Sequence, residues 1–157
     1  MKRKVYIETS VASYLTARPS RDLVVAAHQD LTFEWWTKRR QQFDLYISEL
    51  VLREASKGDP AAAARRLDEL AGIPLLPFND FVEDLARSFV DSGIVPEKAA
   101  DDAMHVAVAT SQGMDFLLTW NCRHIANAEV IERLEAACLQ LGFLLPALCT
   151  PEQLMGD

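Results

Sequence analysis

The residues of this chain that are best suited to chemistry are three carboxylates and one amide. They are Glu8, Glu54, Asp102 and Asn121. Mg²⁺ and Mn²⁺ prefer oxygen ligands of this kind, and three carboxylates offset the charge of such a cation. A cation held in this way activates a water molecule and neutralises charge that develops on a phosphate group. The sequence around each residue indicates whether a fold can bring the four together.

Glu8 and Asn121 each follow a predicted strand. The apolar segment Val5–Ile7 runs directly into Glu8, and Asn121 comes shortly after the segment Phe116–Thr119. Taken alone, Glu8 fits a solvated surface residue, and Asn is common in turns and helix caps. If the two strands are parallel, however, their carboxyl ends meet at one edge of the sheet. There, Asn121 can offer an amide oxygen to a cation or orient a water molecule, but it supplies no charge.

Glu54 ends the segment SELVLRE, residues 48–54, which predicts a short helix. Leu50 and Val51 lie four and three residues before it, on the same helical face, so Glu54 is expected to point toward the sheet. Glu49 lies in the first turn, where the helix dipole favours an acid, and is assigned a structural role. An ordinary exposed Glu54 is the alternative.

Asp102 lies in AADDAMHVAVA, residues 99–109, which is apolar on almost every side and predicts a buried helix. Two adjacent carboxylates in such a helix are costly unless something compensates them. They point about 100° apart, so at most one faces a common site, and Asp101 is the reserve candidate. His105 shares a face with Asp102, either as its partner in the site or as a hydrogen-bonded core residue.

Strands alternate with helices along the whole chain, which predicts an α/β layer fold with a mainly parallel sheet. Ligand sites in such sheets form at the carboxyl ends of the strands. The predicted strands cover residues 5–7, 44–47, 73–76, 116–119 and 146–149. The predicted helices cover residues 11–15, 22–42, 49–57, 60–71, 80–91, 96–112 and 127–141, and TPEQ (150–153) forms a capping box.

Composition limits the class of protein. A chain of 157 residues fits one compact domain, with no repeat, signal peptide or membrane span in sight. A net charge of −7 argues against a large basic surface for nucleic acid, but a nuclease site built from carboxylates is itself acidic. The chain has three cysteines, at positions 122, 138 and 149. Their odd number and wide spacing argue against a disulfide framework and indicate free thiols in a reducing cytoplasm. A zinc site at Cys122 and His124 would lack the usual Cys-x-x-Cys element.

Several segments together resemble the PIN-domain family, of the kind found as VapC-type toxins in bacterial toxin–antitoxin pairs. They are IETS (7–10), the Ser48, Val51 and Glu54 series, DAMHVA (102–107), LTWN (118–121) and CTPEQL (149–154). The resemblance covers nearly the whole chain. Each motif is weak alone, but their order and spacing are together fairly specific.

The resemblance implies a single domain over residues 1–157, folded as a three-layer α/β/α sandwich around a mainly parallel sheet. It implies a metal-dependent endoribonuclease that uses Mg²⁺ or Mn²⁺ and leaves a 5′-phosphate and a 3′-hydroxyl. Glu8, Glu54 and Asp102 fall on the first three acidic positions of the family and are the expected metal ligands. Asn121 falls where the fourth acid usually lies, and Glu8 stands where Asp is common, so a weakened or inactive PIN-like binding module is the alternative.

The resemblance also implies partners. These are an RNA substrate, a cognate antitoxin protein and a second copy of the chain as a homodimer. The aromatic residues Phe33, Trp35 and Trp36 offer a surface for such a partner, with ordinary core packing as the alternative. The hydroxyl of Thr9 or Ser10 is expected to bind a ligand carboxylate. Six basic residues are candidate phosphate contacts: Arg18, Arg21, Lys38, Arg39, Arg53 and Arg123. Hydrolysis of small phosphate esters is a rival function, but no Asp-x-Asp motif or Gly-rich phosphate loop is present.

Overall fold

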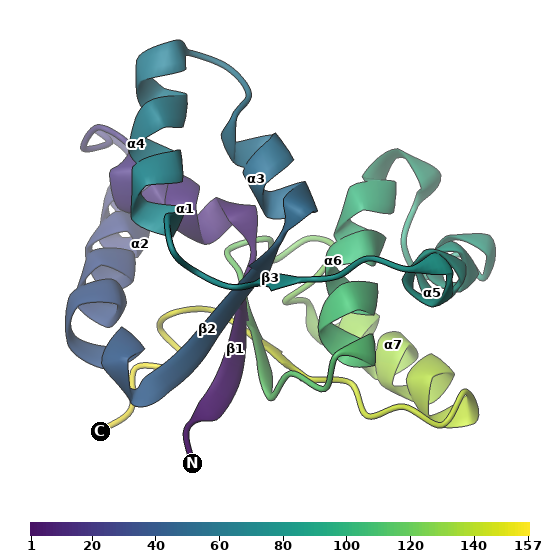
Figure 1. The fold of residues 1–157 in the computed structure, drawn as a ribbon. Coiled ribbons are helices and arrows are strands. Elements are labelled where there is room, and N and C mark those ends of the chain that lie inside the picture. Colours follow the sequence, from purple (N-terminus) through teal and green to yellow (C-terminus); the bar gives the residue numbers. More distant parts are fainter.

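A computed structural model describes residues 1–157, and its centre is a five-stranded, all-parallel sheet in the order β3-β2-β1-β4-β5 (Figure 1). The strands are β1 (Arg3–Ile7), β2 (Phe43–Ser48), β3 (Leu75–Leu76), β4 (Phe116–Leu118) and β5 (Ala147–Cys149). The chain runs outward from β1 to β3 and then crosses to β4, on the other side of β1. The carboxyl ends of β1 and β4 therefore flank a topological switch point, where sites form in such sheets.

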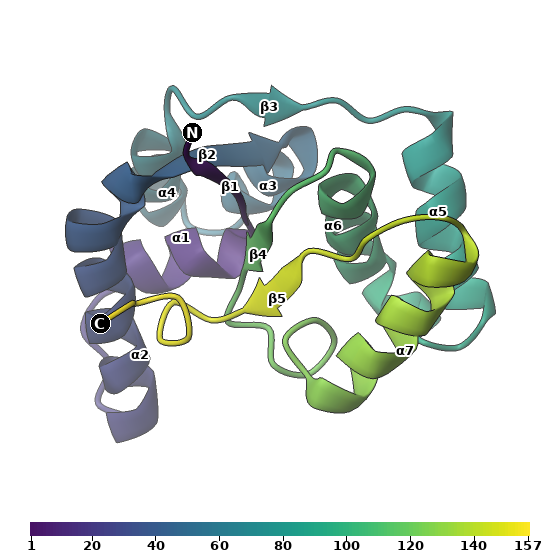
Figure 2. The same ribbon diagram turned by 90° about the horizontal axis from the view of Figure 1, so that it is seen from below.

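Two groups of helices cover the sheet and complete the predicted three-layer α/β/α architecture (Figures 1 and 2). One group, around α1, α2 and α4, lies on one side, and α5, α6 and α7 lie on the other. The α-helices are α1 (Thr9–Thr16), α2 (Leu23–Glu34), α3 (Glu49–Ala55), α4 (Pro60–Leu70), α5 (Asp80–Asp91), α6 (Ala100–Ser111) and α7 (Ala128–Gln140). None of the helices has the length and apolar character needed to span a membrane.

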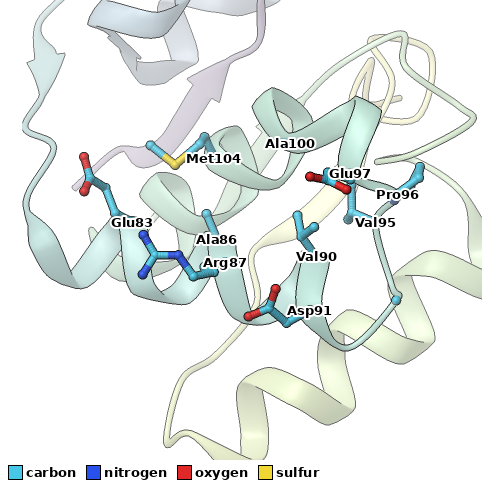
Figure 3. A pocket seen from close by; sticks show the side chains of 11 residues that line it. Glu83, Ala86, Arg87, Val90, Asp91, Val95, Pro96, Glu97, Ala100 and Met104 are labelled. Atoms are coloured by element: carbon cyan, nitrogen blue, oxygen red, sulfur yellow. The ribbon is translucent and has the colours of Figure 1, made fainter.

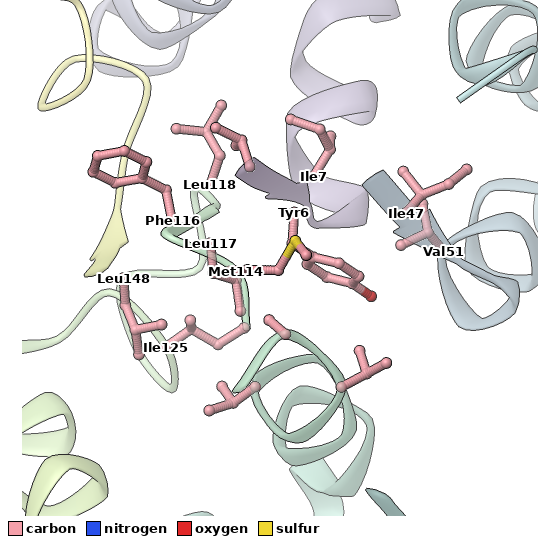
Figure 4. Close-up of a cluster of buried hydrophobic side chains, with 14 of the residues drawn as sticks. Tyr6, Ile7, Ile47, Val51, Met114, Phe116, Leu117, Leu118, Ile125 and Leu148 are labelled. Atoms are coloured by element: carbon pink, nitrogen blue, oxygen red, sulfur yellow. The ribbon is translucent and has the colours of Figure 1, made fainter. Parts of the chain in front are cut away.

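The core explains why the first strand is apolar on both faces. Val5, Tyr6 and Ile7 are fully buried, as are Leu117 and Leu118 on the neighbouring strand. A central parallel strand has helices on both sides, so it is apolar throughout rather than at alternate residues. Figure 4 shows Tyr6 and Ile7 packed near Leu117 and Leu118, with the hydroxyl of Tyr6 as the one oxygen among the labelled residues.

The predicted helix over residues 22–42 is confirmed as helical, but its second half is not α-helical. The α-helix α2 ends at Glu34, a π-helical turn covers Trp35–Arg39 and a 3₁₀ turn covers Arg40–Gln42. Trp35 and Trp36 are both buried within the π-helical turn.

The other predicted elements agree with the structure to within a few residues. The third strand is short and lies at the sheet edge, as its proline indicates. The capping box is confirmed: Thr150 N–H donates to Gln153 Oε1 (3.0 Å), and Gln153 N–H donates to Thr150 Oγ1 (3.3 Å). This capping box begins a single turn rather than a full helix.

Candidate functional site

Glu8 is the N-cap of α1 and is only 6% exposed. Its Oε2 accepts a hydrogen bond from the Ser10 backbone N–H (3.1 Å). Its Oε1 accepts hydrogen bonds from the hydroxyls of Ser10 and Thr119, the latter at 2.6 Å. The N-cap of this helix is thus the carboxylate of Glu8 and not a hydroxyl of Thr9 or Ser10. An acid that ends a buried strand is thus stabilised by the helix that it begins.

Glu54 lies near the end of α3, and its side chain is 24% exposed. Its Oε1 accepts hydrogen bonds from Thr9 Oγ1 and His105 Nε2, both at 2.6 Å. Its Oε2 accepts no hydrogen bond from the protein. The expectation that the hydroxyls after β1 bind ligand carboxylates is met twice, since Thr9 binds Glu54 and Ser10 binds Glu8.

A buried chain of polar groups continues from Glu54 into the core. His105 is fully buried, and its Nδ1 lies 2.7 Å from the hydroxyl of Tyr6. The same hydroxyl lies 2.8 Å from Ser48 Oγ. Ser48 precedes α3 but makes no side-chain cap, because its hydroxyl faces Tyr6 instead. His105 therefore combines the two roles predicted for it, as a hydrogen-bonded core residue and as a neighbour of the acids.

The pKa shifts follow from this arrangement. Burial raises the pKa of Tyr6 far above its usual range, so the phenol stays neutral. Burial alone would lower the pKa of His105, but its hydrogen bond to Glu54 and the surrounding carboxylates raise it overall. Burial raises the pKa of Glu54, but the hydrogen bond and charge of His105 outweigh it and lower that pKa. The two groups therefore favour the ionised pair.

Asp102 faces the same region from the first turn of α6. Burial raises its pKa, and the charge of Glu8 raises it further, while a hydrogen bond from Asn121 opposes the shift. Asp101 is exposed and lies 4.0 Å from Arg53, so the helix turns Asp102 rather than Asp101 toward the other acids. Asp115 precedes β4 and accepts a hydrogen bond from the Lys4 backbone N–H (2.8 Å), at the opposite ends of the strands from these acids.

Asn121 lies beside Asp102, but its amide is oriented differently from the prediction. Its Oδ1 accepts hydrogen bonds from the backbone N–H groups of His124 (2.9 Å) and Arg123 (3.3 Å). The oxygen that was expected to face a cation thus stabilises the loop after β4. The amide nitrogen is then the group left to face Asp102, whose pKa Asn121 lowers.

The arrangement fits a divalent cation. Ligand atoms of Glu8, Glu54 and His105 lie within 4.8 Å of one another. Oε1 of Glu8 and of Glu54 accepts two hydrogen bonds each, which leaves Oε2 of Glu54 free and Oε2 of Glu8 with a single donor. Both ring nitrogens of His105 have protein partners, so the carboxylate oxygens are the groups best placed to bind. Such a donor set suits Mg²⁺ or Mn²⁺.

Other features of the molecule do not form a comparable site. A cavity of about 780 Å³ lies between α5 and the start of α6 (Figure 3), and none of the four predicted site residues lines it. Its charged lining is mostly acidic, with Glu83, Asp91 and Glu97 against Arg87. Cys122 is exposed, whereas Cys138 and Cys149 are buried, and no cysteine belongs to a metal-type cluster.

Sequence analysis missed Tyr6, Ser48 and Thr119 as parts of the site. Tyr6 carried a signal, because residues two apart in a strand share a face and Glu8 follows by two. Thr119 carried a weaker signal, as a hydroxyl residue at the end of an apolar strand.

The comparisons with known proteins do not identify a family for this chain. No family model matches the chain, and a search of curated proteins finds no match.

Proposed function

We propose that this protein is a Mg²⁺- or Mn²⁺-dependent endoribonuclease, as its resemblance to the PIN-domain toxins implies. The observation that carries the proposal is the convergence of Glu8 and Glu54, with His105, at the carboxyl edge of the sheet. Asp102 lies near enough for the charge of Glu8 to raise its pKa. Glu8 follows β1, Glu54 lies in α3 and Asp102 lies in α6, so the three acids are widely separated in the sequence. Grouping three carboxylates is costly without a cation, so the arrangement favours a metal-binding role.

Each polar residue of the site has its own role in the proposed function. Glu8, Glu54 and Asp102 would hold the cation, which, when bound, supplies an activated water and neutralises charge on the phosphate. Ser10 and Thr119 fix Glu8, and Thr9 and His105 fix Glu54. Asn121 lies beside Asp102 and lowers its pKa, which favours the ionised carboxylate. Each acid is thus oriented by the protein before substrate arrives, which lowers the cost of reaching the reactive arrangement.

Cleavage of mixed RNA tests this function. Wild type is expected to cut RNA with Mg²⁺ or Mn²⁺, to leave 5′-phosphate ends and to stop when EDTA is added. Asp102→Asn should abolish cleavage, whereas Asp101→Asn removes the same charge one residue away and should leave it intact. Equal cleavage by wild type and Asp102→Asn would refute the site.

A second candidate is a PIN-like module that binds but does not cut. The observation in its favour is Asn121, because it adds no charge and its oxygen is committed to the loop. Titration of Mn²⁺ into the pure protein distinguishes the two. No binding and no thermal shift would favour the inactive module.

If the protein is a toxin, its proposed partners are a cognate antitoxin and a second copy of the chain in a homodimer. Trp35 and Trp36 are buried in this chain's own core, so they are not available to a partner as free surface. Three apolar side chains of α2 do remain exposed: Leu23, Val24 and Phe33. Exposed apolar surface of this kind is what an amphipathic partner helix covers. Size-exclusion chromatography that shows a strict monomer would count against the homodimer.

A further inference from the structure

His105 is the most constrained polar side chain near the acids. It is fully buried, and each ring nitrogen has one partner: Nε2 faces Glu54 and Nδ1 faces Tyr6. The hydroxyl of Tyr6 is held in turn by Ser48 at 2.8 Å. Because the Glu54 carboxylate accepts only, Nε2 is the donor of that hydrogen bond. The ring is therefore oriented from both ends, by β1 and β2 on one side and by α3 on the other.

This contact determines which oxygen of Glu54 is available. His105 and Thr9 both donate to Oε1, at 2.6 Å each, while Oε2 receives no hydrogen bond. Without the imidazole, Oε1 would retain only the hydroxyl of Thr9, on a side chain that is 24% exposed and free to rotate. A fixed carboxylate binds a cation with a smaller loss of conformational entropy than a mobile one.

We infer that His105, anchored by Tyr6 and Ser48, is a positioning residue that fixes Glu54 and thereby sets the affinity of the site for a divalent cation. This inference rests on the proposed function, since it concerns the same acids. His105 acts through Glu54 rather than as a ligand. Direct binding through Nε2 would break the hydrogen bond to Glu54, and Nδ1 faces Tyr6 in the core.

The test measures Mn²⁺ affinity by isothermal titration calorimetry on the full chain without RNA. His105→Leu should weaken binding about 10- to 100-fold, because this is the loss typical of groups that orient metal ligands. His105→Gln places an amide N–H near the position of Nε2 and should recover most of that loss. Tyr6→Phe removes only the hydroxyl and should weaken binding by a smaller factor. Thr110→Val is the matched control, because Thr110 is a buried α6 residue whose hydroxyl donates only to the Val106 carbonyl, and it should leave the affinity unchanged.

The possible outcomes distinguish a failure of this inference from a failure of the proposed function on which it rests. Circular dichroism checks that each variant folds, and Tyr6→Phe carries the test if His105→Leu does not. Unchanged affinity in folded His105→Leu, or in Tyr6→Phe if only that variant folds, overturns the inference while leaving the proposed function in place. No Mn²⁺ binding by wild type overturns both. Pulsed electron paramagnetic resonance of bound Mn²⁺ should show no directly coordinated nitrogen, and a nitrogen signal that vanishes in His105→Gln would make His105 a ligand instead.

Discussion

Replacing Asp102 with Asn should remove about half or more of the stability that a divalent cation gives this protein, and replacing Asp101 should not. The two residues are adjacent and lose the same charge, but they face different surroundings. Asp102 is half-buried beside Glu8 and Asn121, whereas Asp101 is exposed and lies 4.0 Å from Arg53. A surface pair of that kind contributes little to stability. The comparison therefore isolates the position of the carboxylate from its charge.

The size of the effect follows from ligand linkage. A cation at a hundred times its Kd stabilises the folded state by about 2.7 kcal/mol. The entropy of unfolding is about 2.1 cal/mol/K per residue, so 1 kcal/mol shifts the Tm of a 157-residue chain by about 3 °C. Wild type should therefore gain about 8 °C. If Asp102→Asn weakens binding about tenfold, the gain falls to about 4 °C at the same cation concentration, and further if the loss is larger.

The assay is thermal unfolding of wild type, Asp101→Asn and Asp102→Asn, each with and without Mn²⁺. Without metal, Asp102→Asn should unfold at the same temperature as wild type or slightly higher. Burial and the charge of Glu8 raise the pKa of Asp102, so its ionised form is disfavoured in the folded state. A smaller metal shift in this variant thus cannot be attributed to a damaged fold. Equal metal shifts in both variants would refute the reasoning and place the cation elsewhere.

Three further results are expected. Thr119→Val removes the 2.6 Å hydrogen bond to the buried Glu8 and should lower the free energy of unfolding by about 1.5–3 kcal/mol in urea titrations. Ellman's reagent should titrate Cys122 in the native protein and all three thiols after denaturation, because burial raises the pKa of Cys138 and Cys149 to about 11. The pKa of His105 is raised on folding, so its contribution is complete below about pH 6.5 and is lost as pH rises through the raised value. Metal-free wild type should therefore lose stability relative to His105→Gln as the pH rises above about 6.5.

The strand-end residues were predictable because one physical rule applies to them. In a parallel sheet the carboxyl ends of the strands meet at one edge, so Glu8 and Asn121 had to lie close if both segments were neighbouring strands. β1 and β4 are neighbours, with Ile7 opposite Leu118. Periodicity also predicted that Glu54 lies on the face of α3 that points inward.

What the sequence left open depends on the rotation of helices and on pairs of residues far apart. Periodicity did not decide between Asp101 and Asp102, because only the packing of α6 fixes which one faces Glu8. The hydrogen bond between Tyr6 and His105 joins residues 99 positions apart, and that between His105 and Glu54 joins residues 51 apart. No local pattern specifies such pairs.

The orientation of Asn121 bears on how many cations the site can hold. Three carboxylates more than offset one divalent cation, but two divalent cations would leave a net positive charge before substrate arrives. A fourth acid at position 121 would reduce that excess, whereas Asn adds no charge and uses its oxygen to hold the backbone of Arg123 and His124. The remaining amide nitrogen is a donor, which suits a carboxylate such as Asp102 and not a cation. The chemistry of these groups therefore favours one tightly held cation, so calorimetric titration of wild type with Mn²⁺ should give a stoichiometry near one per chain, and a second tight site would contradict this argument.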